Sequence, residues 1–145
     1  MSTNTFPYWK LAPNAFNALN KFTETLETGS VDKKLKNLIY LRISQINGCA
    51  YCTELHGRDL RKDGETPERM DTLAAWKESP HFTHDERLAL RWAEAVTYLK
   101  DQQVPKELFN ELKTSYSDTQ IAELTFAIAS INAWNRIAIS MHRAV

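Results

Sequence analysis

Glycine and proline are scarce in this chain of 145 residues, which has four glycines and five prolines. Both residues interrupt regular structure, so their scarcity favours helices joined by short connections. No pair of strand-like segments is evident, which argues against a β-sheet domain. The sequence therefore predicts an all-α fold of about six or seven helices. A single domain over residues 1–145 is expected, and a chain of this length can enclose a real core.

Net charge is also absent, because 18 lysines and arginines balance 18 aspartates and glutamates. Without a basic patch or an acidic tail, neither nucleic acid nor a membrane surface is expected as a partner. No apolar stretch approaches the length of a membrane span. The first residues, MSTNTFPYWK, lack the basic flank and apolar run of a signal peptide. The expected location is the cytoplasm.

Cysteine is nearly absent as well, and its two copies, Cys49 and Cys52, form one Cys-x-x-Cys motif. In a reducing compartment such a pair is more typical of catalysis or metal binding than of a structural disulfide. His56 follows four residues after the second cysteine. The helix-boundary residues Asn47 and Gly48 precede the motif, so both cysteines are expected in the first turn of a helix.

The spacing of these residues predicts a shared helix face. At about 100° per residue, Cys49, Cys52 and His56 lie on one side of the helix, with Asp59 beside them. Unpaired N–H groups at a helix N-terminus favour the thiolate, the form of cysteine that attacks peroxides and disulfides. The second thiol can close a disulfide with the oxidised first one, and an imidazole can move protons. The pattern predicts a redox-active dithiol with an adjacent base.

Two other interpretations of the cysteines are weaker. A buried cysteine pair can be inert packing, but the spacing, the helix start and His56 all favour redox chemistry. Structural zinc needs four ligands, and His81 or His84 could complete the set only if the fold brought it back. These two histidines and His142 are otherwise expected to be loop or terminal residues. No metal and no cofactor are therefore expected.

Helical spacing of apolar residues or a capping signal marks seven segments: 13–28, 31–46, 50–62, 66–76, 83–99, 105–112 and 117–142. Ser30 is expected to cap the second segment, Thr66 the fourth, and Thr83 and Ser117 to begin capping boxes. Trp76, Trp92 and Trp134 are expected in the core or at an interface.

The final helix is apolar on nearly every face and needs cover on all sides. A homo-oligomer, from a dimer upward, is therefore expected.

The segment LKNLIYLRISQINGCAYCTELHGRDLRKDGE, with the later AAWKESPHFT, ALRWAEAVT and INAWNRIAI, resembles the carboxymuconolactone decarboxylase superfamily and, within it, the AhpD-like alkylhydroperoxidase branch. The resemblance runs over residues 11–141, and Cys-x-x-Cys-x-x-x-His is its specific part. It implies a multi-helix bundle that forms trimers or hexamers. The implied activity is reduction of hydroperoxides through a dithiol–disulfide cycle, with electrons from another thiol protein or dithiol. By the same resemblance Cys52 is the peroxidatic thiol, Cys49 the resolving thiol and His56 the proton-relay histidine.

The chain also departs from that family pattern. Helix position alone would favour Cys49 as the nucleophile, because it lies nearer the N-terminus and is expected to be the more accessible thiol. For peroxide attack we nevertheless keep the family's order, with Cys52 as the nucleophile. Cys49 is assigned the exchange with the reductant. The family often has a glutamate twelve residues before the first cysteine, where this chain has Asn37, and an amide cannot accept a proton at neutral pH. Tyr51 stands where some members carry a second histidine. Asp59 could orient the ring of His56, and Glu123 could approach from the final helix.

Two other functions remain compatible with the sequence. The namesake decarboxylation of a muconolactone does not need two cysteines, so the Cys-x-x-Cys motif argues against it. A non-enzymatic, redox-sensing or partner-binding oligomer is the other, in which Asn37 marks lost turnover. It predicts stoichiometric oxidation without efficient cycling.

Overall fold

The computed structural model describes residues 6–141, which contain helices and no strand. The α-helices are α1 (Tyr8–Leu11), α2 (Pro13–Thr25), α3 (Lys33–Asn47), α4 (Ala50–Lys62), α5 (Pro67–Thr72), α6 (His84–Tyr98), α7 (Lys106–Leu112) and α8 (Asp118–Ser140). Three short 3-10 segments follow α2, α5 and α6: η1 (Leu26–Thr28), η2 (Leu73–Ala75) and η3 (Lys100–Gln102). The predicted all-α class is confirmed. The described residues hold eight α-helices rather than six or seven, because the single turn of α1 is too short to show a period.

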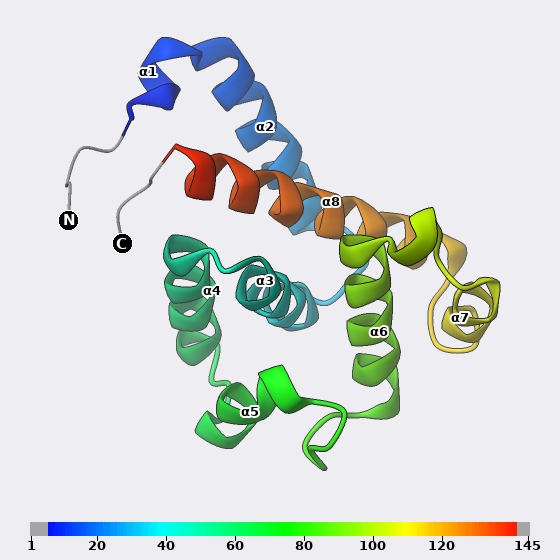
Figure 1. Ribbon diagram of the computed structural model, residues 1–145. Helices are drawn as coiled ribbons and strands as arrows, with labels where there is room; N and C mark the ends of the chain where they lie inside the picture. The colour runs from blue at the N-terminus through cyan, green and yellow to red at the C-terminus, as the bar shows by residue number, and fades with distance from the viewer. Residues whose placement is uncertain (1–5, 142–145) are drawn as a thin grey trace.

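Helix α3 lies at the centre of the fold, between α4 and α6, and α8 runs across all three (Figure 1). The α3 residues Leu38, Ile39 and Ile43 are at most 1% exposed, as expected for a helix that is apolar around most of its circumference. Helix α2 lies on the outer side of α8 (Figure 1). Two edge-to-face ring pairs hold it there, Phe16 with Trp134 and Phe22 with Phe126. None of the helices in the described part of the chain is long and apolar enough to span a bilayer.

Capping residues set most of the helix boundaries where the sequence predicts them. Thr83 and Ser117 each begin a complete capping box, and the hydroxyl of Thr66 accepts a backbone N–H at the start of α5. The prediction that Ser30 caps the central helix is wrong. Asp32 caps α3 instead, since its carboxylate accepts the N–H of Leu35 at 3.2 Å.

Ser30 has a different partner on α8. Its backbone N–H and its hydroxyl both donate to the carboxylate of Glu123, at 2.6 and 2.9 Å. These hydrogen bonds lower the pKa of Glu123. Glu123 therefore holds the connection between η1 and α3 against α8, and it does not line either cavity of the candidate site described below. The expectation that it could serve the histidine is wrong.

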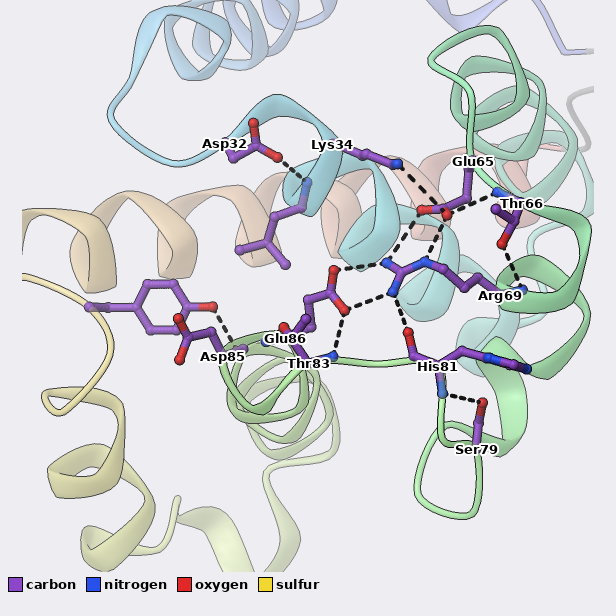
Figure 2. A network of polar contacts seen from close by, with 12 residues as sticks. Asp32, Lys34, Glu65, Thr66, Arg69, Ser79, His81, Thr83, Asp85 and Glu86 are labelled. Carbon is purple, nitrogen blue, oxygen red and sulfur yellow. Dashed lines mark hydrogen bonds and ion pairs between the residues drawn. The ribbon is translucent and has the colours of Figure 1, made fainter.

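A network of charged side chains joins α3, the α4–α5 connection, α5 and α6 (Figure 2). The side chain of Glu65 has no exposed surface and accepts the Nε–H of Arg69 at 2.7 Å, while Nζ of Lys34 lies 3.8 Å away. The other guanidinium nitrogens of Arg69 donate to Glu86 at 2.8 and 2.9 Å and to the carbonyl of His81. Burial alone would raise the pKa of Glu86, but its hydrogen bonds outweigh burial and lower it. This Arg69 network fixes the end of α4 against α6.

Candidate redox site at Cys49 and Cys52

The Cys-x-x-Cys motif lies at the junction of α3 and α4. Gly48 ends α3 with φ of +73°, a left-handed conformation that favours glycine. The N–H of Cys49 then donates to the carbonyl of Ser44 at 3.0 Å, and Cys49 becomes the N-cap residue of α4. Its sulfur accepts the N–H of Cys52 at 3.3 Å. Both cysteines therefore lie at the start of a helix, where the backbone N–H groups favour negative charge on sulfur.

The two sulfurs are joined in a disulfide, and the Cα atoms of Cys49 and Cys52 are 5.4 Å apart. This separation lies within the usual range for disulfides. Both residues are buried, with Cys49 1% and Cys52 4% exposed. The expectation that Cys49 is the more accessible thiol is wrong, because its sulfur turns back onto the helix end while Cys52 lines a cavity.

The cavity beside Cys52, here called the thiol cavity, has a volume of about 240 Å³. Three parts of the chain line it: α1 and α2 (Tyr8, Phe16, Asn20, Thr23), α4 (Tyr51, Cys52, Leu55, His56) and α8 (Ile131, Trp134, Ala138). Most of these side chains are aromatic or aliphatic. The hydroxyl of Thr23 is already engaged, because it accepts the indole N–H of Trp134 at 2.8 Å and bonds to the carbonyl of Leu19 at 3.0 Å. A ligand in this cavity would contact mainly apolar surface next to the sulfur.

A second cavity of about 480 Å³, here called the charged cavity, lies on the other side of His56. Its lining is Thr23, Leu26, Glu27, Lys33, Lys36, Asn37, Tyr40, Leu55, His56, Asp59, Lys62 and Asp63. It holds three carboxylates and three lysines, so its character is the opposite of that of the thiol cavity. Thr23, Leu55 and His56 line both cavities and form the wall between them.

His56 is neutral at pH 7 in this environment. Its Nδ1 atom is buried without a hydrogen-bond partner among the described residues, and its ring lies 5.0 Å from the ring of Tyr40. Burial lowers the pKa of His56 to about 4, and the carboxylate of Asp59 acts in the opposite direction. A neutral imidazole beside Cys52 can accept the thiol proton, as the sequence suggests.

The supporting residues named from the sequence divide between the two cavities. Tyr51 lines the thiol cavity, whereas Asn37 and Asp59 line the charged one. Asn37 is buried, and its amide donates to the carboxylate of Asp63 at 3.4 Å. Asp59 lies next to His56 but gives Nδ1 no hydrogen bond. The structure therefore brings Cys52, His56, Asn37 and Asp59 into one region of the molecule.

His81 and His84 lie away from this region. His81 is in the loop before α6, and His84 is the first residue of that helix. Neither lines the thiol cavity or the charged cavity. Within residues 6–141 no group of three or more His, Cys, Asp or Glu side chains is arranged to hold a metal ion. His142 lies outside the described residues.

Sequence reasoning missed the aromatic lining of the thiol cavity. Tyr8 and Phe16 come from the N-terminal helices, and Trp134 comes from α8. The apolar period of α2 indicates that Phe16 faces inward, but nothing in the sequence shows that it faces a cysteine more than thirty residues away. Trp134 is half-buried at this cavity, whereas Trp76 and Trp92 are buried in the core as predicted.

Comparison with known proteins adds the evolutionary context. The model of the carboxymuconolactone decarboxylase family matches residues 13–95. The chain is 35% identical to the uncharacterized protein YdfG of Bacillus subtilis over 92% of its own length and 91% of YdfG. Among solved structures it is similar to ATU0492 of Agrobacterium tumefaciens, a protein of unknown function provisionally assigned as the antioxidant defence protein AhpD. The two structures have a TM-score of 0.93 and 34% sequence identity, and the match covers 98% of this chain and 97% of ATU0492. The debrominase Bmp8 shares the fold, with a TM-score of 0.77 and 21% identity over 92% of this chain and 72% of Bmp8. The chain belongs to the carboxymuconolactone decarboxylase family.

Proposed function

We propose that the protein reduces organic hydroperoxides through a dithiol–disulfide cycle of Cys49 and Cys52. The observation that carries this proposal is the position of Cys52, at the first turn of α4 and in the wall of an apolar cavity that His56 shares. Family membership and the similarity to ATU0492, with its provisional link to antioxidant defence, support it. Cys52 is the thiol that meets the peroxide, because Cys49 does not line the cavity.

The cycle begins when His56 takes the proton of the Cys52 thiol. The thiolate attacks the terminal oxygen of the hydroperoxide, so that an S–O bond forms as the O–O bond breaks. The alkoxide takes the proton from His56 and leaves as an alcohol, and Cys52 becomes a sulfenic acid. The Cys49 sulfur then attacks the Cys52 sulfur, the disulfide forms, and water leaves. The dithiol has lost two electrons, and an external thiol protein or dithiol must return them.

The thiol cavity favours a compact organic substrate over hydrogen peroxide. Its volume of about 240 Å³ exceeds the about 150 Å³ of an engineered apolar cavity that binds benzene. Aromatic side chains from α1, α2 and α8 would surround the hydrocarbon part, while the peroxide group lies between Cys52 and His56. Bmp8, of similar fold, has been solved with 2,3,4-tribromopyrrole, a single aromatic ring.

The test is a thiol count on the fully reduced protein before and after one equivalent of an organic hydroperoxide such as cumene hydroperoxide. The expected result is rapid loss of both thiols, a mass decrease of about two hydrogens for the disulfide, and one equivalent of alcohol. Hydrogen peroxide at the same concentration should react more slowly. Unchanged thiols would contradict the proposal. Oxidation without repeated turnover in the presence of excess dithiothreitol would favour a redox sensor instead.

Decarboxylation of a carboxylated lactone is less well supported. Among the described residues that line the thiol cavity there is no lysine or arginine, and His56 is neutral there. A carboxylate substrate would therefore lose its hydration without gaining a cationic partner, which is costly. Turnover of carboxymuconolactone that survives replacement of both cysteines would favour this alternative.

We also propose that the protein is a homo-oligomer. Phe126 and Ile139 on α8 are 58% and 44% exposed. Tyr98 and Leu99 at the C-terminal end of α6 and Phe109 on α7 are also exposed. Burial of these side chains between subunits would stabilise the assembly. Light scattering at micromolar concentration is expected to give a multiple of the mass of one chain. The mass of a single chain would contradict the proposal.

A further inference from the structure

Within residues 6–141, His56 is the one ionisable side chain that lines both cavities. On one side of its ring is the apolar cavity with Cys52, and on the other is the charged cavity. The ionisable groups of the charged cavity come from three elements and are Glu27 on η1, Lys33, Lys36 and Tyr40 on α3, and Asp59, Lys62 and Asp63 on α4 or directly after it. A proton that His56 takes from Cys52 therefore places a positive charge at the boundary of an apolar and a polar space.

That positive charge needs compensation. Burial disfavours the imidazolium, and Nδ1 of His56 has no hydrogen-bond partner among the described residues. The thiolate of Cys52 supplies one negative charge, but this charge moves to the alkoxide oxygen when the sulfur attacks the peroxide. A second, permanent negative charge near the ring would keep the protonated His56 available until the alkoxide leaves.

Two of the lysines of the cavity have partners of their own. Lys36 donates to the carbonyl of Leu26, and Lys33 lies 4.0 Å from the carboxylate of Asp63. The charge of Glu27 acts on Tyr40. Burial and this charge together raise the pKa of Tyr40 to about 12. Asp59 lies three residues after His56 on the same helix, and three-residue spacing places side chains together on a helix surface. It is the carboxylate whose charge raises the pKa of His56 against the effect of burial.

We propose that Asp59 is a positioning residue for the thiol chemistry, whose carboxylate stabilises the imidazolium of His56 from the charged cavity while Cys52 reacts in the thiol cavity. The proton moves from the sulfur of Cys52 to His56 and then to the leaving alkoxide, and Asp59 is not on this path. This inference rests on the proposed function for its peroxide step. The stabilisation of the Cys52 thiolate that it requires can be measured without a peroxide.

The experiment measures the alkylation rate of Cys52 by iodoacetamide between pH 5 and 9 in reduced Cys49→Ser protein. Adding Asp59→Asn is expected to lower the rate at pH 6.5 by about tenfold, the size of a one-unit pKa shift, because fewer thiolates are paired with an imidazolium. The sign of the change is decisive. If Asp59 acted only through repulsion of the thiolate, its removal would raise the rate, and a raised or unchanged rate overturns the proposal.

Three further variants distinguish an effect of the charge at position 59 from a structural effect. A thermal melting curve is recorded for each variant to check that it is folded. Asp59→Glu keeps the charge and is expected to retain most of the rate. Glu27→Gln removes an exposed carboxylate from the same cavity and should leave the rate unchanged. Asn37→Glu combined with Asp59→Asn places a carboxylate in the part of the same cavity that α3 lines and should restore part of the rate. Equal losses in the Asn and Glu variants of position 59 would show a structural role and contradict the proposal.

Peroxide assays on the same proteins keep the two proposals distinct. If the wild-type protein does not react with hydroperoxides but the alkylation series behaves as expected, the proposed function fails and the Asp59 role in thiolate formation stands. If the wild-type protein reduces hydroperoxides and Asp59→Asn does so at the same rate across the pH range, the Asp59 inference fails and the proposed function stands.

Discussion

Replacing Cys52 by serine is expected to lower the rate of organic hydroperoxide reduction by about three orders of magnitude or more, the scale on which removal of a nucleophile acts. Cys49→Ser is expected to have a different effect. Its Cys52 thiol still lines the cavity and still reacts with one equivalent of peroxide, but no neighbouring thiol remains to form the disulfide. The product is therefore a stable sulfenic acid on Cys52, and turnover stops after one equivalent.

Trapping with dimedone followed by mass spectrometry of the peptides distinguishes the two variants. The adduct is expected on Cys52 in the Cys49→Ser protein and not on Cys49 in the Cys52→Ser protein. Serine is a favourable N-cap residue, so the Cys49→Ser protein should keep the start of α4 and serve as a matched, folded control. Sulfenic acid on Cys49 with fast peroxide consumption in the Cys52→Ser protein would reverse the two roles.

The sequence predicts those parts of the site that depend on neighbours along the chain. The helix boundary at Gly48, the helix start at Cys49 and the common region of Cys52 and His56 follow from spacing and capping rules. The cavity itself does not follow, because its wall needs Phe16 from α2 and Trp134 from α8. Contacts between distant segments leave no periodic signal at Cys52, so the sequence alone reveals neither the volume nor the apolar lining.

The wrong predictions have the same origin. Cys49 is less exposed than Cys52 because its sulfur folds back as a helix cap, a detail of orientation that residue spacing does not contain. Ser30 carries a good capping hydroxyl, but Glu123 on the distant α8 competes for it and Asp32 replaces it as the cap. In both cases residue type and spacing leave the direction of a side chain open, and the folded chain sets it.

The Arg69 network carries the largest expected effect on stability. Arg69→Met is expected to lower the free energy of unfolding by about 3–5 kcal/mol, because it leaves the carboxylate of Glu65 buried without its main partner. Lys34 cannot replace the guanidinium fully, since it lies 3.8 Å from Glu65 and its side chain is 44% exposed. Denaturation of the disulfide form by urea, monitored by circular dichroism, measures the loss.

Arg91→Met provides the matched control. Arg91 pairs with Glu111 at 2.8 Å, the same distance that separates Arg69 from Glu86. The Arg91–Glu111 pair lies at the surface, with side chains 44% and 46% exposed. Its expected cost is about 1 kcal/mol or less. Glu65→Leu combined with Arg69→Met removes the uncompensated charge and should recover a substantial part of the loss. Equal losses in the two arginine variants would show that burial of Glu65 is not the cause. Since Glu65 lies three residues after the end of α4, the network also fixes the helix that carries Cys52 and His56. Arg69→Met is therefore expected to weaken stability first and to leave the alkylation rate of Cys52 unchanged at temperatures where the protein is folded.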